Sequence, residues 1–175
     1  MRNIFLIGYM GCGKTTIGRL LADDLGMQFV DLDTFIETRF HKTIDALFQE
    51  HGEDRFRTIE MNALKEIAQF ENIIVSTGGG APCFFNNLEM MKENGTVVYL
   101  KASVDELLKR LWVGKYKRPL LKEKNKEEMS EYITTTLEKR ESFYSQADYI
   151  YRAERQNTEN EVKAIVERLK TYFSS

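Results

Sequence analysis

Residues 8–15 read GYMGCGKT and match the phosphate-binding loop pattern G-x-x-x-x-G-K-[ST]. The apolar run at residues 3–7 predicts a buried strand, and apolar residues at helical spacing after Lys14 predict a helix that ends at Gly26. Glycines let the backbone curl so that several N–H groups point at phosphate oxygens, and the helix N-terminus adds positive potential. A glycine-rich turn with an incidental lysine is the alternative, but the strand–loop–helix context favours a phosphate site. In such a site Lys14 bridges the β- and γ-phosphates and the Thr15 hydroxyl ligates Mg²⁺.

Two carboxylates stand at the end of the second predicted strand, at residues 28–32. Asp31 and Asp33 are two positions apart, and side chains alternate along a strand, so we expect both on one face. At the carboxyl end of a parallel strand both would reach the ligand crevice, one toward metal-bound water and the other toward a substrate hydroxyl. The alternative is a helix start at which Asp33 or Thr34 acts only as a cap. The phosphate-binding loop nearby favours the functional interpretation.

Strand and helix patterns alternate along the whole chain. Strands are predicted at residues 3–7, 28–32, 73–75, 96–100 and 148–151. Strands separated by helices predict an α/β fold in three layers, with a five-stranded parallel sheet, helices on both faces and right-handed crossovers. We expect one domain over residues 1–175, with insertions at residues 34–60 and 112–125.

Several helix starts carry a capping signal. We expect N-caps at Thr43 and Asn86, and capping boxes at Ser103 with Glu106 and at Thr158 with Glu161. The helix after Thr43 is predicted to be short and to end near Gly52, before a longer helix over residues 56–67.

Composition and charge exclude several classes of protein. The 175 residues are 42% hydrophobic and 30% charged, which is the composition of a globular domain. The apolar run at residues 4–7 is far too short for a membrane span or a signal peptide. A net charge of −2 argues against a general nucleic-acid binder. Cys12 and Cys83 form no disulfide framework, so we expect a reducing, cytoplasmic location.

Further candidates for ligand binding lie after the third predicted strand. Residues 77–81 read TGGGA, and this glycine triplet allows close backbone approach with free N–H groups, although a flexible turn has the same composition. Arg57, Arg118 and Arg140 stand out because a guanidinium grips carboxylate or phosphate with a planar fork of donors. Arg118 ends the basic segment 115–118, which fits a mobile lid over the transferring phosphate, a solvated loop or, more weakly, a nucleic-acid patch.

Together these motifs resemble the shikimate kinase family, whose members are small kinases with a phosphate-binding loop and a fold related to that of nucleoside monophosphate kinases. The resemblance covers nearly the whole chain, and its motifs occur in order at suitable spacing. They are GYMGCGKTT at 8–16, D-x-D at Asp31 and Asp33, F-R at Phe56 and Arg57, GGGA at 78–81, R-P-L-L at 118–121 and R-x-x-x-Y at Arg140 and Tyr144.

The resemblance implies a reaction and a set of ligands. The reaction is phosphorylation of the 3-hydroxyl of shikimate by MgATP, a step of chorismate and aromatic amino-acid biosynthesis. The implied partners are the small molecules shikimate and ATP, with no nucleic acid and no membrane, and a monomer is the default. The implied ATP contacts are Gly11, Cys12, Gly13, Lys14, Thr15, Thr16, Arg110, Arg118 and Gln156, with Thr15 on Mg²⁺ and Asp31 near the metal through water.

The resemblance also implies roles on the acceptor side. Asp33 is expected to hydrogen-bond the reacting hydroxyl, and Arg57 and Arg140 to clamp the shikimate carboxylate. The backbone of residues 78–80 (Gly78, Gly79 and Gly80) is expected to aid that clamp, while Arg110 lies against the adenine and Gln156 closes its pocket. The implied catalytic set is Lys14, Asp33 and the lid residue Arg118.

The chain departs from the family pattern at a few positions, and other functions share its motifs. Ser142 stands where the family often has proline, and Cys12 replaces a commoner small residue of the loop. A kinase acting on gluconate or on a nucleotide has the same loop, lid and fold, although no base pocket is marked here. A binding module without catalysis is the other alternative, against which the intact set of Lys14, Thr15, Asp33 and Arg118 argues.

Overall fold

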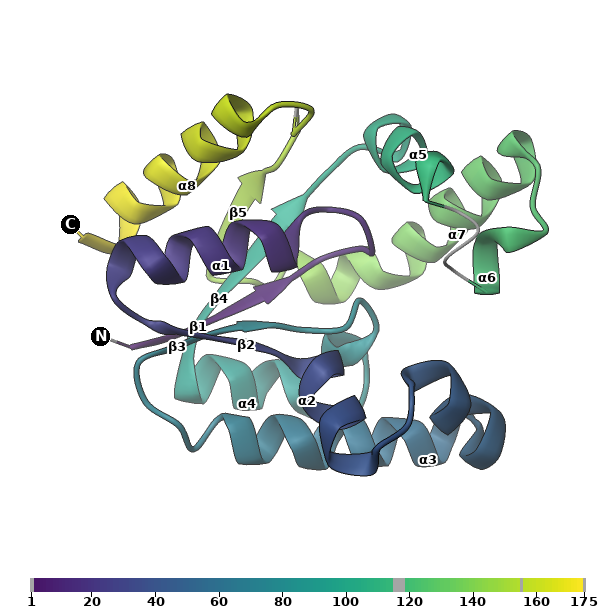
Figure 1. The fold of residues 1–175 in the computed structure, drawn as a ribbon, viewed down its shortest axis with the longest axis horizontal. Helices are drawn as coiled ribbons and strands as arrows, with labels where there is room; N and C mark the ends of the chain where they lie inside the picture. The colour runs from purple at the N-terminus through teal and green to yellow at the C-terminus, as the bar shows by residue number, and fades with distance from the viewer. Residues whose placement is uncertain (1, 115–118, 155, 175) are drawn as a thin grey trace.

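The computed structural model describes residues 2–114, 119–154 and 156–174. Its centre is a parallel sheet with the strand order β2-β3-β1-β4-β5 (Figure 1). The strands are β1 (Asn3–Ile7), β2 (Gln28–Asp31), β3 (Ile73–Ser76), β4 (Gly95–Lys101) and β5 (Tyr149–Arg152). The predicted α/β fold with five parallel strands is confirmed.

Helices cover both faces of the sheet. They are α1 (Lys14–Leu25), α2 (Leu32–Phe40), α3 (Ile44–Ile67), the 3-10 turn η1 (Ala81–Cys83), α4 (Asn87–Asn94), α5 (Val104–Val113), α6 (Pro119–Lys122), α7 (Lys126–Tyr144) and α8 (Glu159–Ser174). In Figure 1, α1 and α8 lie together on one face of the sheet, and α3 and α4 lie on the other. The sheet and the helices on its two faces form the three predicted layers.

The central strand β1 divides its side chains between two cores. Every residue of β1 is buried, and Ile4 and Leu6 belong to the core shared with α1 and α8. Phe5 and Ile7 belong to the core shared with α3 and α4. This alternation is the period-two geometry of a strand, and a continuous apolar run satisfies both faces because both are covered.

The strand register brings two loops together at the carboxyl ends of the strands. Leu6 pairs with Ser76 on one side of β1, and Ile7 pairs with Tyr99 on the other. The loop that follows β1 therefore lies beside the turn that follows β3. The strand order also changes direction at β1, and open parallel sheets bind ligands at the carboxyl ends of their strands at such a point.

The first inserted segment contains a bent helix. Gly52 has φ 74° and ψ 173°, so α3 consists of two helical pieces joined at this residue. The predicted break near Gly52 is confirmed, although the second piece follows at once. The Phe48 and Phe56 rings stack across the bend with centroids 4.1 Å apart. This packing fixes the start of the second piece, which carries Arg57.

The predicted helix caps have mixed outcomes. The Thr43 hydroxyl accepts from the Ala46 N–H at 3.2 Å, as predicted, but the Asn86 side chain makes no capping bond. The Thr158 and Glu161 side chains each bond the other's backbone N–H, which confirms that capping box. Only half of the predicted box forms at residues 103–106. The Glu106 N–H donates to the Ser103 hydroxyl, but the Glu106 side chain does not bond the Ser103 N–H.

The second inserted segment is described only in part. The chain from 119 to 122 forms α6, and the predicted lid residue Arg118 lies outside the described residues, as do 115–117. Over the described ranges, no helix is both long enough and apolar enough to cross a membrane.

Candidate active site

The loop between β1 and α1 takes a backbone shape that glycine permits. Gly8, Gly11 and Gly13 have φ values of 138°, 79° and 101°, a region that residues with a side chain rarely adopt. A Cβ at Gly8 would also lie 2.7 Å from the Leu100 carbonyl oxygen. The predicted curl of the loop is therefore present, with Gly13 directly before the first residue of α1.

Lys14 reaches back over this loop. Its side chain is buried, and its ammonium donates to the carbonyls of Gly8 at 2.8 Å and Tyr9 at 2.9 Å. The Cys12 sulfur lies 3.7 Å away. The loop backbone therefore holds the positive charge above the helix N-terminus, where a phosphate group would meet both.

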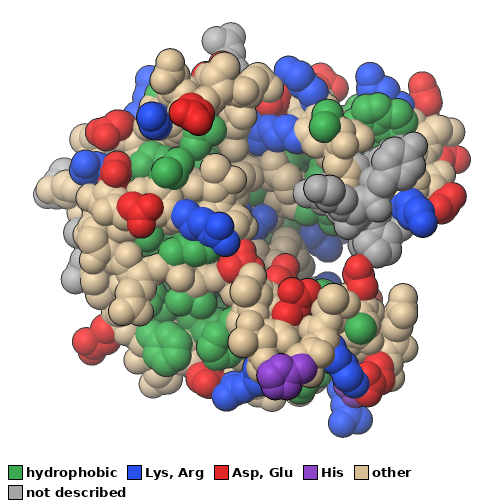
Figure 2. Space-filling model, in the orientation of Figure 1, with side chains coloured by type: hydrophobic (Ala, Val, Ile, Leu, Met, Phe, Trp, Pro, Cys, Tyr) green, Lys and Arg blue, Asp and Glu red, His purple; other side chains and the backbone are tan. Residues whose placement is uncertain are grey.

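A cavity of about 370 Å³ opens over the loop. It is lined by Gly11, Gly13, Lys14, Thr15, Thr16, Arg110, Leu111 and Gln156. The structure thus brings together the loop and both residues predicted beside the adenine, although these lie on α5 and after β5. Figure 2 shows the molecule hollowed on this face, with acidic and basic side chains gathered at the hollow.

Arg110 is fixed in place by three acceptors. Its Nε donates to Glu106 at 2.9 Å, and its other nitrogens donate to the carbonyls of Gly11 at 3.2 Å and Ala153 at 3.0 Å. This explains the incomplete capping box, because the Glu106 carboxylate that would bond the Ser103 N–H is occupied by Arg110. The Ser103 N–H donates to Glu154 instead, at 2.8 Å.

Gln156 closes the rim of the same cavity. Its amide donates to the carbonyls of Cys12 and Ala153, both at 2.9 Å. A side chain at Gly13 would collide with its carboxamide. The segment after β5 is therefore tied to the phosphate-binding loop across 144 residues of sequence.

Thr15 and Asp31 meet beside the loop. The Thr15 hydroxyl donates to an Asp31 carboxylate oxygen at 2.9 Å and lies 3.4 Å from the Ser76 hydroxyl. The other Asp31 oxygen accepts from the Thr34 N–H at 3.2 Å, so Asp31 is the N-cap of α2. The expected strand geometry of Asp31 and Asp33 was wrong, because β2 ends at Asp31 and Asp33 belongs to the first turn of α2.

Asp33 nevertheless lies beside the glycine turn that follows β3. A Cβ at Gly78 would lie 3.3 Å from its carboxylate and 2.9 Å from that of Glu60. Burial, with the negative charges of Asp31 and Glu60 adding to it, raises the pKa of Asp33 to about 6. The nearby Lys14 charge acts in the opposite direction. Asp33 is therefore a carboxylate that can change its protonation near neutral pH.

Arg57 is a buried cation held by carboxylates. One nitrogen donates to Glu60 at 2.8 Å and another to Glu53 at 3.2 Å. Glu60 has 1% exposed surface, and burial raises its pKa while the charge of Arg57 opposes that rise. The guanidinium lies 4.2 Å from the Phe84 ring centroid, and aromatic faces attract cations.

Arg140 lies on the far side of the glycine turn. A Cβ at Gly79 would be 3.1 Å from an Arg140 nitrogen, and a Cβ at Gly80 would be 2.6 Å from an Arg57 nitrogen. The bare backbone of the triplet thus separates two guanidinium groups that α3 and α7 supply. Tyr144, one turn after Arg140, donates its hydroxyl to the Gly79 carbonyl at 2.5 Å.

Some residues of the site were not predicted. Glu53, Glu60, Ser76 and Phe84 all contact predicted site residues. The spacing of Glu53 and Glu60 from Arg57, four residues before it and three after it, places both on one helix face and was a usable signal. The sequence contained no comparable signal for Phe84, whose contact crosses between elements.

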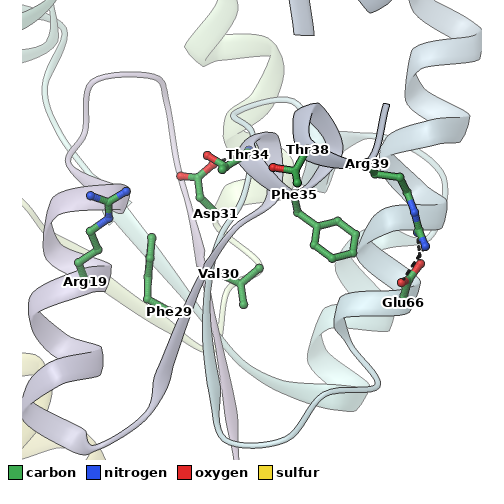
Figure 3. A pocket seen from close by; sticks show the side chains of 9 residues that line it. All are labelled: Arg19, Phe29, Val30, Asp31, Thr34, Phe35, Thr38, Arg39 and Glu66. Atoms are coloured by element: carbon green, nitrogen blue, oxygen red, sulfur yellow. Dashed lines mark hydrogen bonds and ion pairs between the residues drawn. The ribbon is translucent and has the colours of Figure 1, made fainter. Parts of the chain in front are cut away.

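A larger pocket of about 480 Å³ lies along the edge strand β2 (Figure 3). The side chains of Phe29 and Phe35 form apolar parts of its lining, and Arg39 is paired with Glu66. Asp31 also lines it, but the phosphate-binding loop and the glycine triplet do not. We therefore assign the chemistry to the smaller cavity, which has the convergent charged and backbone groups.

Comparison with known proteins identifies the family. Residues 10–170 match the shikimate kinase family model. A shikimate kinase of Parabacteroides distasonis is 52% identical over 94% of this chain and 95% of its own length. The crystal structure of shikimate kinase from Bacteroides thetaiotaomicron is 46% identical, covers 99% of both chains and has a TM-score of 0.96. Shikimate kinase from Acinetobacter baumannii, solved in complex with shikimate, is 36% identical, with a TM-score of 0.84 over 99% of this chain and 94% of its own. The chain belongs to the shikimate kinase family.

Proposed function

We propose that this protein transfers the γ-phosphoryl group of ATP to the 3-hydroxyl of shikimate, giving shikimate 3-phosphate and ADP. This reaction is a step of chorismate and aromatic amino-acid biosynthesis. The observation that carries the proposal is that a phosphate-binding loop, the buried Arg57 and the half-buried Arg140 converge on one glycine turn.

The nucleotide occupies the cavity over the loop. Residues 11–16 surround its phosphates with backbone N–H groups, and Lys14 neutralises charge on the β- and γ-phosphates. Arg110 and Gln156, at the rim, lie against the adenine and close its pocket. The hydrogen bonds of both side chains to the loop backbone support this role, because they hold these side chains beside the loop.

The donor set beside the loop suits Mg²⁺. The Thr15 hydroxyl and the Asp31 carboxylate are oxygen donors 2.9 Å apart, and Mg²⁺ prefers oxygen ligands together with retained waters. Thr15 would hold the ion directly and Asp31 through water. When bound with ATP, the ion supplies positive charge that neutralises the transferring phosphate.

The acceptor is fixed by its carboxylate. Arg57 and Arg140 bind it from two sides of the glycine turn, and Gly78, Gly79 and Gly80 let the ring approach because their backbone carries no side chains. This hold directs one hydroxyl toward the γ-phosphate beside Asp33. Asp33 orients that hydroxyl and accepts its proton, late in a loose transition state.

Phosphoryl transfer depends on in-line geometry and charge neutralisation more than on covalent help. We assign Lys14 and the lid residue Arg118 to neutralise the transferring group. Closure of the segment at 112–125 over the site would exclude water and limit wasteful ATP hydrolysis. Arg118→Ala is expected to lower turnover about 10³-fold, by analogy with arginine fingers, and near-normal turnover would reject the lid role.

One assay tests the reaction and its rivals together. Purified protein with MgATP is assayed for ADP release with shikimate, gluconate or a nucleoside monophosphate, and without acceptor. Stimulation by shikimate alone supports the proposal. Stimulation by another acceptor would keep the kinase and replace the substrate, and ATP binding without stimulation by any acceptor would favour a non-catalytic role.

A further inference from the structure

One buried hydroxyl binds the backbone of the glycine turn between the two proposed clamp arginines. Tyr144 is the last residue of α7, has 0% exposed surface and donates to the Gly79 carbonyl at 2.5 Å. Arg140 lies one helical turn earlier on α7, and a Cβ at Gly79 would be 3.1 Å from one of its guanidinium nitrogens. Two side chains of α7, one turn apart, therefore meet the same residue of the turn after β3.

The Gly79 carbonyl differs from its neighbours in what binds it. The Gly78 carbonyl accepts from the Ala81 N–H at 3.1 Å, and the Gly80 carbonyl accepts from the Cys83 N–H at 2.9 Å. Both bonds are local to the turn, whereas the Gly79 carbonyl is bound by a side chain 65 residues away. Because a peptide group is planar, holding this carbonyl also fixes the direction of the Gly80 N–H in the same plane.

We propose that Tyr144 is a positioning residue for the acceptor carboxylate. Its hydroxyl fixes the Gly79–Gly80 peptide relative to α7, the helix that carries Arg140, so that the peptide and the guanidinium both meet one carboxylate. The inference rests on the proposed function, since it concerns how that site holds its acceptor. Loss of the hydroxyl should weaken acceptor binding and leave the nucleotide side unchanged.

Tyr99 provides a matched control for this hydroxyl. Its ring centroid lies 4.9 Å from that of Tyr144, and its side chain is equally buried. Its hydroxyl donates to Glu141 at 3.0 Å, not to the glycine turn. Tyr99→Phe therefore removes a buried hydroxyl bond from the same cluster without changing a partner of Gly79.

The test compares wild type, Tyr144→Phe and Tyr99→Phe in steady-state kinetics and thermal unfolding. Tyr144→Phe is expected to raise KM for shikimate roughly tenfold, with KM for ATP and kcat within about twofold of wild type. Tyr99→Phe is expected to leave all three constants near wild type. Each variant is also assayed with a shikimate analogue whose carboxylate is replaced by hydroxymethyl, and there the loss in kcat/KM for Tyr144→Phe should largely vanish.

Several outcomes would overturn the inference. An unchanged KM for shikimate in Tyr144→Phe would reject it, as would equal increases in both variants. An equal loss in Tyr144→Phe with shikimate and with the hydroxymethyl analogue would show that the hydroxyl serves only stability. Failure of the proposed function is seen separately, because wild type itself would then not use shikimate.

Discussion

Lys14 and Arg57 are both buried cations, but the chain holds them in different ways. Lys14 donates to two backbone carbonyls of its own loop, at Gly8 and Tyr9. Arg57 is bound by the carboxylates of Glu53 and Glu60, and its orientation depends on a bend in α3 and on rings from separate segments.

This contrast separates the two halves of the site. The nucleotide half is a local structure, in which backbone geometry makes the binding surface and one side chain adds the charge. The acceptor half is assembled from α2, α3, the turn after β3 and α7. We therefore expect substitutions in the first half to change turnover, and substitutions in the second to change the affinity for shikimate.

The largest effect is expected at Lys14. Lys14→Ala removes a charge that we assign to the transferring phosphate, so kcat should fall about 10³-fold or more. The initial rate of ADP release measures the loss in kcat. Lys42→Ala is the control, because Lys42 is exposed and paired with Glu50. If kcat of Lys14→Ala stayed within tenfold of wild type, the nucleotide half would not control turnover as expected.

A second substitution tests the acceptor half. Arg57→Ala is expected to raise KM for shikimate about 10²-fold, the scale of losing a buried charged partner, with ATP affinity unchanged. Arg39→Ala is the matched control, since Arg39 is also a helical arginine paired with a glutamate but is exposed. Titration of shikimate and of ATP separates the effects, and equal affinities in the variant and wild type would reject the clamp.

A third prediction concerns pH. The pKa of Asp33 is raised to about 6, so its carboxylate is mostly ionised at pH 7 and becomes protonated as the pH falls through 6. If the ionised form accepts the hydroxyl bond, kcat/KM for shikimate at saturating MgATP should fall about tenfold per pH unit below that value. An activity that stays level down to pH 5 would reject this role.

The raised pKa of Asp33 also affects the stability of the fold, and its effect on stability has the opposite pH dependence to its effect on activity. A carboxyl whose pKa is higher in the folded state favours the fold most below its unfolded value, and this contribution is lost as pH rises through about 6. Asp33→Asn should therefore raise the melting temperature at pH 7, and the gain should disappear near pH 4. It should also lower activity, which separates the functional charge from the stable fold.

The smallest effect is expected away from both halves. Thr43→Ala removes the N-cap bond to Ala46 and should cost about 1 kcal/mol of stability. Thermal unfolding measures this cost, and kcat and KM at 25 °C should remain near wild type. A raised KM for shikimate would show that the first piece of α3 is coupled to Arg57 across the Gly52 bend.

Much of the nucleotide half could be predicted from sequence. Residues 8–15 present consecutive backbone groups between a strand and a helix, so their spacing alone predicts a phosphate site there. The positions of Arg57, Arg140 and the glycine triplet were identified by resemblance to a family, while their individual patterns were weak. The strand alternation in β1 likewise follows from short-range periodicity.

Other features were decided by contacts between distant segments. Asp33 belongs to a helix and not to a strand, because Asp31 ends β2 by capping α2 while bonding Thr15. Glu106 binds Arg110 instead of completing a capping box, since the segment after β5 brings Glu154 to the Ser103 N–H.

The sequence by itself determined the fold class and the phosphate-binding loop, because these depend on local spacing and backbone chemistry. The residues of the acceptor site were implied by the resemblance to a family. Only the tertiary structure decided that the Phe84 ring lies against Arg57 and that the Tyr144 hydroxyl binds the glycine turn. The physical reason is that a buried polar group must find a partner, and the sheet register and helix packing select which distant residue supplies it.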